Sequence, residues 1–86
     1  MRELLLDCWD DVKLNDVLGE GQHSPDSNYI VESVSKEEIK VRRLVSGDTT
    51  MYTYYRMGQK YAVEHYRFGG KERQNIIDRY LFGLTK

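Results

Sequence analysis

YIVESVSKEEIKVRRLVSGDTTMYTYY, residues 29–55, is the stretch that decides the fold. It begins with β-branched and aromatic side chains, passes through a polar turn, and continues with Ile39 and Val41 alternating with basic residues. Alternation with a period of two is typical of a half-buried strand. The stretch therefore predicts a β-hairpin formed by residues 29–34 and 39–45.

The alternation slips inside the second strand of this hairpin. Leu44 has the opposite parity from Ile39 and Val41. One extra residue at Arg42–Arg43 would return Leu44 to the buried face, so we expect a β-bulge at that point.

A turn and further strands are predicted after the hairpin. Gly47 stands in a Ser-Gly-Asp turn and supplies the positive φ that such a turn needs, and residues 49–55 then resume a strand pattern. Gly58-Gln59 is suited to a two-residue type II′ turn, which predicts that residues 60–68 fold back as a fourth strand. A helix over 59–68 remains the alternative, since this run also shows helical spacing.

Pairing across the predicted turn divides the side chains between two faces, with Tyr52 opposite His65. We expect one face to be core: Met51, Thr53, Tyr55, Met57, Ala62 and Tyr66. The other face combines tyrosines with a basic edge: Tyr52, Tyr54, Tyr61, Val63, Arg56, His65 and Arg67. Such a face suits base stacking or a protein interface, and a purely structural role is the alternative.

The N-terminal third predicts a short helix or extended lead-in, followed by a strand. Four apolar side chains share one helical face: Leu5, Cys8, Trp9 and Val12. Residues 12–19 then alternate as a strand would, and 19–28 is the longest loop.

The C-terminal segment predicts a helix that covers the open end or one face of the sheet. Gly69-Gly70 ends the strands, and residues 71–84 carry apolar side chains at helical spacing. We expect Gly83 to lie at the helix C-cap. The side chains expected to be structural are Ile76, Ile77 and Leu81.

Taken together, these patterns predict an α+β fold that is mainly β, with a small antiparallel sheet or an SH3-like barrel and a C-terminal helix. A chain of 86 residues is expected to form a single domain over 1–86, with a β-rich body at 1–68 and a helix at 71–84. The order of strand and turn signals between Val12 and Tyr55 resembles that of small SH3-like or Tudor-like barrels. That resemblance implies a binding module more often than an enzyme.

Charge is divided along the chain, although the net charge is only −1. Residues 1–38 contain three basic and ten acidic side chains, a net charge of −7, whereas residues 39–86 contain ten basic and four acidic side chains, a net charge of +6. The two halves either neutralise each other in the fold or form an acidic face and a basic face.

No catalytic, metal or cofactor motif is present in the sequence. Cys8, His23 and His65 are isolated from one another, so we expect no zinc site. Residues 19–21 lack the lysine of a phosphate-binding loop, and His23-Ser24 lacks a third group to orient a base. We therefore expect neither an enzyme nor a cofactor.

The function that follows is a small binding module for another protein, such as the inhibitors or adaptors that viruses and mobile elements encode. A nucleic-acid-binding module is the alternative, although a pI near 6.1 favours a protein partner. The candidate partner-binding residues are Tyr52, Tyr54, Tyr61, Arg56, His65, Arg67, Arg42 and Arg43. The lone cysteine and the lack of a long apolar run predict no membrane and a cytoplasmic location, in its own cell or an infected host.

Overall fold

The predicted hairpin is present in the sheet. The computed structural model describes residues 2–21, 25–57 and 64–84, and in it β3 (Asn28–Val34) pairs antiparallel with β4 (Glu38–Arg43). The turn between them is closed by Ser35, whose N–H donates to the Glu38 carbonyl over 2.9 Å. β5 (Met51–Tyr55) pairs with β4 after a turn in which Gly47 has a φ of 81°. The hairpin, this turn and the third strand are thus confirmed.

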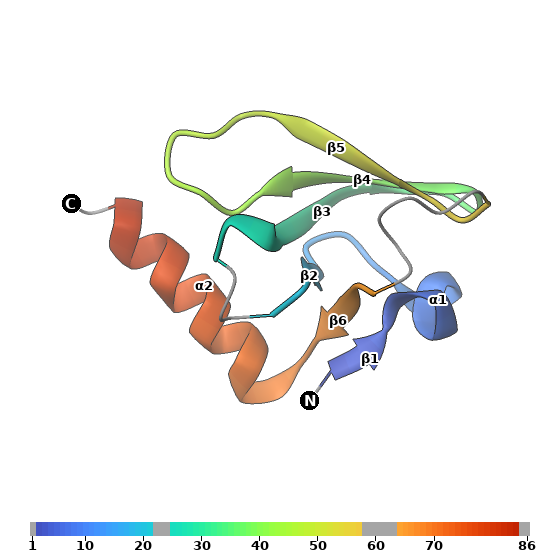
Figure 1. Cartoon of the computed structure of the whole chain (residues 1–86), viewed down its shortest axis with the longest axis horizontal. Coiled ribbons are helices and arrows are strands. Elements are labelled where there is room, and N and C mark those ends of the chain that lie inside the picture. The colour runs from blue at the N-terminus through green and yellow to red at the C-terminus, as the bar shows by residue number, and fades with distance from the viewer. Residues whose placement is uncertain (1, 22–24, 58–63, 85–86) are drawn as a thin grey trace.

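Three short strands complete a six-stranded antiparallel sheet. They are β1 (Arg2–Leu4), β2 (Val17–Gly19) and β6 (Tyr66–Phe68), and the strand order is β1-β6-β2-β3-β4-β5. The sheet curves, so that β3, β4 and β5 lie above β2, β6 and β1 (Figure 1). Within the described residues β1 and β5 are its two edges, and the sheet is not closed into a barrel. The mainly β, α+β architecture is confirmed at this level.

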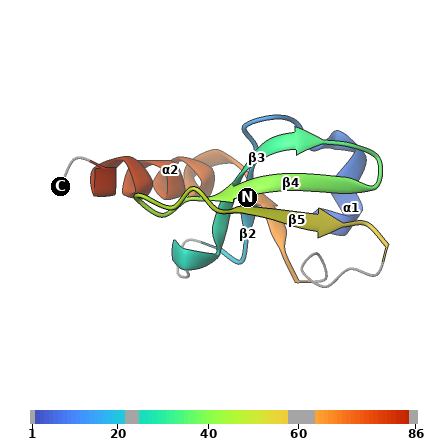
Figure 2. The same ribbon diagram turned by 90° about the horizontal axis from the view of Figure 1, so that it is seen from above.

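The helical elements lie at the two ends of the curved sheet (Figure 1). α1 (Leu5–Cys8) and a following 3-10 turn (Trp9–Asp11) lie at one end, and α2 (Gly70–Leu84) lies at the other. A second 3-10 turn (Pro25–Ser27) precedes β3. Figure 2 shows α2 continuing past the strands on the side of the β4–β5 connection.

Each face of the sheet has its own hydrophobic cluster. The inner cluster contains Leu5, Cys8, Trp9, Val12, Leu18, Val31, Ile39, Val41 and Tyr54. The outer cluster, under α2, contains Val17, Leu44, Phe68 and Ile76. Val17 and Leu18 are therefore both fully buried although they are neighbours in a strand. A sheet covered on both faces does not need strict alternation of apolar and polar side chains.

The predicted β-bulge at Arg42–Arg43 is wrong, because both faces of the sheet are buried. Leu44 packs in the outer cluster, so regular alternation already places it on a buried face. Its N–H donates to the Asn28 carbonyl over 2.8 Å, which continues the pairing of the two strands. The register shift lies in β3 instead, between Val31 and Ser33.

The prediction that residues 60–68 pair with β5 is wrong where it can be examined. β6 pairs with β1 and β2, and β5 pairs with β4, so Tyr52 lies opposite Val41 rather than His65. The helical alternative is wrong for 66–68, which form a strand. The Gly58-Gln59 turn, together with Tyr61, Ala62 and Val63, lies outside the described residues.

The two faces predicted for β5 are reversed. Tyr54 is 2% exposed because it pairs with Ile39 and shares the inner face with it. The side chains expected to be core are exposed instead: Met51 by 48%, Tyr55 by 51% and Met57 by 84%. The outer cluster under α2 does not extend to these residues.

The N-terminal prediction is confirmed for its helical face and only partly for its strand. Leu5, Cys8, Trp9 and Val12 are all buried in the inner cluster. The strand occupies Val17–Gly19 alone, because residues 13–16 form a turn in which Asp16 Oδ2 accepts from the Lys13 N–H over 2.9 Å. β1 was not anticipated.

The C-terminal helix is confirmed, with two corrections. Ile76 is buried, but Leu81 is 49% exposed and does not belong to the outer cluster. Gly83 lies within α2 and lacks the positive φ of a C-cap glycine. The helix passes close to Ser46, whose Cβ is 4.0 Å from the position that a Cβ on Gly83 would take.

Candidate binding site: an aromatic pocket inside the sheet

Three of the predicted site residues converge on one cavity. Tyr52, Tyr54 and His65 meet there with Tyr29, which the sequence analysis did not select. The cavity has a volume of about 70 Å³, and its lining residues are Tyr29, Val41, Tyr52, Thr53, Tyr54 and His65. We call this the aromatic pocket.

The ring arrangement is well defined. Tyr29 contacts Tyr52 and Tyr54 edge-to-face, with ring centroids 5.6 and 6.1 Å apart, and lies nearly parallel to His65 at 6.3 Å. Tyr54 and His65 meet edge-to-face at 5.3 Å. Such geometry places electron-rich ring faces beside electron-poor ring edges, which favours a fixed cluster. The walls of the pocket are thus held by one another.

The residues come from separate parts of the chain. Tyr29 is in β3, and Tyr52 and Tyr54 are in β5. His65 immediately precedes β6 and is fixed by its carbonyl, which accepts from the Leu5 N–H over 2.9 Å. The pocket therefore lies between the two layers of the curved sheet.

A hydrogen bond between Tyr54 and His65 links these layers. The Tyr54 hydroxyl lies 2.5 Å from His65 Nδ1, and His65 Nε2 lies 3.7 Å from Glu20 Oε1. A neutral imidazole protonated on Nε2 satisfies both contacts, because Nδ1 then accepts from the hydroxyl and Nε2–H faces the carboxylate.

Burial sets the protonation of both groups. It lowers the pKa of His65 below its ordinary value, an effect that outweighs the opposing influence of Glu20. It also raises the pKa of Tyr54 far above its ordinary value. The pocket is therefore lined by a neutral imidazole and a protonated phenol near neutral pH.

This arrangement predicts that stability falls as the pH falls below the ordinary His pKa of 6.5. The unfolded chain takes up a proton on His65 at a higher pH than the folded chain does, so protonation favours unfolding. We expect the free energy of unfolding, from urea titrations, to decrease between about pH 7.5 and 5.5. His65→Asn keeps an acceptor for the Tyr54 hydroxyl but does not titrate, and should show a flatter profile. An unchanged profile in this variant would contradict the assignment to His65.

The four arginines proposed as site residues do not gather at one place. Arg43 lies beside Tyr52, with Cζ 5.6 Å from the Tyr52 ring centroid and Nη2 2.5 Å from Asp48 Oδ2. Arg42 bonds to Glu32 over 3.0 Å and to the Tyr80 hydroxyl over 3.2 Å, beneath α2.

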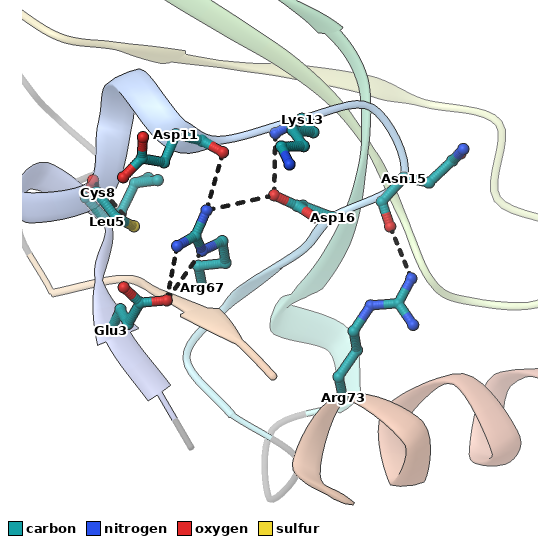
Figure 3. Close-up of polar contacts among 9 residues, drawn as sticks. All are labelled: Glu3, Leu5, Cys8, Asp11, Lys13, Asn15, Asp16, Arg67 and Arg73. Carbon is teal, nitrogen blue, oxygen red and sulfur yellow. Dashed lines mark hydrogen bonds and ion pairs between the residues drawn. The ribbon is translucent and has the colours of Figure 1, made fainter. Parts of the chain in front are cut away.

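Arg56 and Arg67 join the strands to the N-terminal segment. Arg56 makes two hydrogen bonds to Asp10, of 2.8 and 3.2 Å. Arg67 bonds to Glu3 over 2.7 Å and to the Asp11 carbonyl over 3.0 Å, as Figure 3 shows. These contacts connect the acidic half of the chain with its basic half, so neutralisation between the halves accounts for much of the charge division.

The free cysteine, Cys8, is buried in the inner cluster. Burial raises the pKa of the Cys8 thiol, which donates to the Leu5 carbonyl over 3.7 Å. Within residues 2–21, 25–57 and 64–84 no group of three or more His, Cys, Asp or Glu side chains is placed to hold a metal ion. In the same ranges, no helix is long and apolar enough to cross a membrane.

Comparison with protein-family models, with curated proteins and with solved structures finds no match to this chain. The pocket must therefore be interpreted from its own geometry. Tyr29 was not among the predicted site residues, although the sequence contains a signal for it. It has the same parity in the hairpin as Val31, which is buried.

Proposed function

We propose that this chain is a non-enzymatic protein-binding module whose aromatic pocket receives one side chain of its partner. The observation that supports this most strongly is the convergence of three tyrosines and a histidine, from separate elements, on a cavity of about 70 Å³. Concave apolar sites with a few fixed polar groups are the usual form of binding sites. Tyrosine is also enriched among residues that dominate binding energy at protein interfaces.

The protonation states support a binding role over catalysis. Nucleophilic or general base chemistry needs a group that ionises near neutral pH or is activated by a neighbour. Burial keeps the Tyr54 hydroxyl protonated, and that hydroxyl is already bonded to His65. The Cys8 thiol is likewise kept protonated by burial.

Size and charge support a protein partner over nucleic acid. A cavity of roughly 150 Å³ holds benzene, so the pocket is too small for a nucleobase. Arg42, Arg43, Arg56 and Arg67 each contact a carboxylate, which reduces the positive charge offered to phosphates. An inhibitor or adaptor acting in the cytosol, of viral or mobile-element origin, is the form of this proposal that we favour. The consecutive order β2-β3-β4-β5 is compatible with a proposed relation to SH3-like barrels.

The proposal predicts that Tyr52→Ala removes partner binding while Tyr55→Ala retains it. The two tyrosines lie on one strand, but Tyr52 lines the pocket and Tyr55 points outward from it, 51% exposed. Each variant and the parent chain would be immobilised and exposed to an extract of the native host. Mass spectrometry should identify a protein retained by the parent and by Tyr55→Ala and lost from Tyr52→Ala, a loss of at least about tenfold in affinity.

Circular dichroism and a melting curve of each variant provide the folding control. Retention of the same protein by a folded Tyr52→Ala variant would overturn the proposal. Retention of nucleic acid, with an affinity that falls steeply as salt is added, would favour the alternative function instead.

A further inference from the structure

The charged residues around the aromatic pocket indicate which kind of partner side chain the pocket binds. We infer that the partner's side chain is a lysine, whose stem lies against the tyrosine rings and whose ammonium group reaches Glu20 beside His65. This inference rests on the proposed function and gives it a ligand chemistry.

The size of the cavity suits an unbranched aliphatic stem. Its volume of about 70 Å³ is less than half that of a cavity of roughly 150 Å³ that holds benzene, so a narrow unbranched chain suits it better than a flat ring. Lysine carries a flexible aliphatic stem with a compact charge at its end. Such a side chain buries its stem on apolar surface while its charged end stays near water.

Negative charge is concentrated at the His65 end of the pocket. Glu20 Oε1 lies 3.7 Å from His65 Nε2, and its side chain is 53% exposed, so it can turn toward an incoming cation. Glu64 is exposed and directly precedes His65. The imidazole beside Glu20 is neutral near pH 7 and does not repel a cation.

Tyr52, in the wall of the pocket, already contacts a cation of the chain. The Arg43 guanidinium lies over the Tyr52 ring, 5.6 Å from its centroid, which shows that this ring attracts positive charge. Asp48 neutralises Arg43 through a contact of 2.5 Å. A second cation is therefore favoured at the Glu20 end, and its stem would lie in the cavity against the walls that Tyr29, Tyr52 and Tyr54 form.

The test uses n-butylammonium, which copies the end of a lysine side chain, and n-butanol, which has a similar length without the charge. Each would be titrated into the full chain at constant ionic strength and near neutral pH, with binding followed by NMR shifts of the pocket residues. We expect saturable shifts at Tyr29, Tyr52, Tyr54 and His65, and an affinity for n-butylammonium about two- to fivefold higher than for n-butanol.

A matched pair of variants assigns the preference to one carboxylate. Glu20→Gln should remove the preference for the cation and leave the affinity for n-butanol unchanged. Glu37→Gln makes the same change in net charge at an exposed residue of the β3–β4 turn, and should keep the preference.

The outcomes separate this inference from the proposed function. Equal affinities for the two probes at the pocket would overturn the lysine inference while leaving the pocket as a binding site. A preference that survives in Glu20→Gln would also overturn it. The absence of saturable shifts with either probe would remove the pocket as a site and would contradict the proposed function too.

Discussion

Replacing Trp9 by alanine is expected to lower the free energy of unfolding by about 3–5 kcal/mol. The indole is 2% exposed and packs in the inner cluster that joins α1 to the sheet. Its Nε1–H also donates to the Ser35 carbonyl over 3.3 Å, so that the N-terminal segment is tied to the β3–β4 turn. The substitution removes both the packing and this bond. Urea unfolding followed by circular dichroism measures the change.

Leu14→Ala is the control for this prediction. Leu14 belongs to the same N-terminal segment but is 60% exposed, so we expect a change within about 0.5 kcal/mol. Similar losses from Trp9→Ala and Leu14→Ala would show that the inner cluster is not centred where the structure places it.

Replacing Ile76 by alanine should cost about 2–5 kcal/mol, whereas Leu81→Ala should cost less than about 1 kcal/mol. Both residues lie in α2 and both are aliphatic, but Ile76 is 2% exposed and Leu81 is 49% exposed. Ile76 packs beside Val17, Leu44 and Phe68 in the outer cluster. The comparison therefore measures how α2 is attached to the sheet.

The same unfolding titrations report this difference. A large loss in Leu81→Ala with little change in Ile76→Ala would mean that α2 is rotated about its axis relative to the structure. Equal, small losses would mean that α2 contributes little to stability.

Local signals in the sequence were sufficient for the hairpin, the Gly47 turn and the C-terminal helix. Ile39 and Val41 have a period of two, and the residues after Gly70 have helical spacing. These patterns depend on neighbouring residues and on one buried face each. They do not depend on which distant strands pair.

The errors arose where both faces of the sheet are covered. Leu44 has the parity of the outer cluster, so an apparent slip in alternation was mistaken for a bulge at Arg42–Arg43. Tyr54 faces inward because it pairs with Ile39, a contact that the assumed turn at Gly58-Gln59 obscured. Long-range pairing, such as that of β6 with β1 and β2, has no signal in the spacing of either segment.

The candidate site was partly visible in the sequence. The shared face of Tyr52 and Tyr54 was predicted, although it is an inner face, and the pairing that placed His65 opposite Tyr52 is wrong. The arginines were selected for positive charge, but Arg56 and Arg67 are paired with acids more than forty positions away in the chain. Such pairs cannot be assigned from local patterns, because any acid in the N-terminal half was a possible partner.

An NMR spectrum of the chain, recorded with and without its retained protein partner, tests the role of the aromatic pocket most directly. The proposed function predicts the largest shifts at Tyr29, Tyr52, Tyr54 and His65, in the wall of the pocket. Large shifts confined to the outward side chains of β5, Met51 and Tyr55, or to the exposed end of α2, with no change at the pocket, would contradict it.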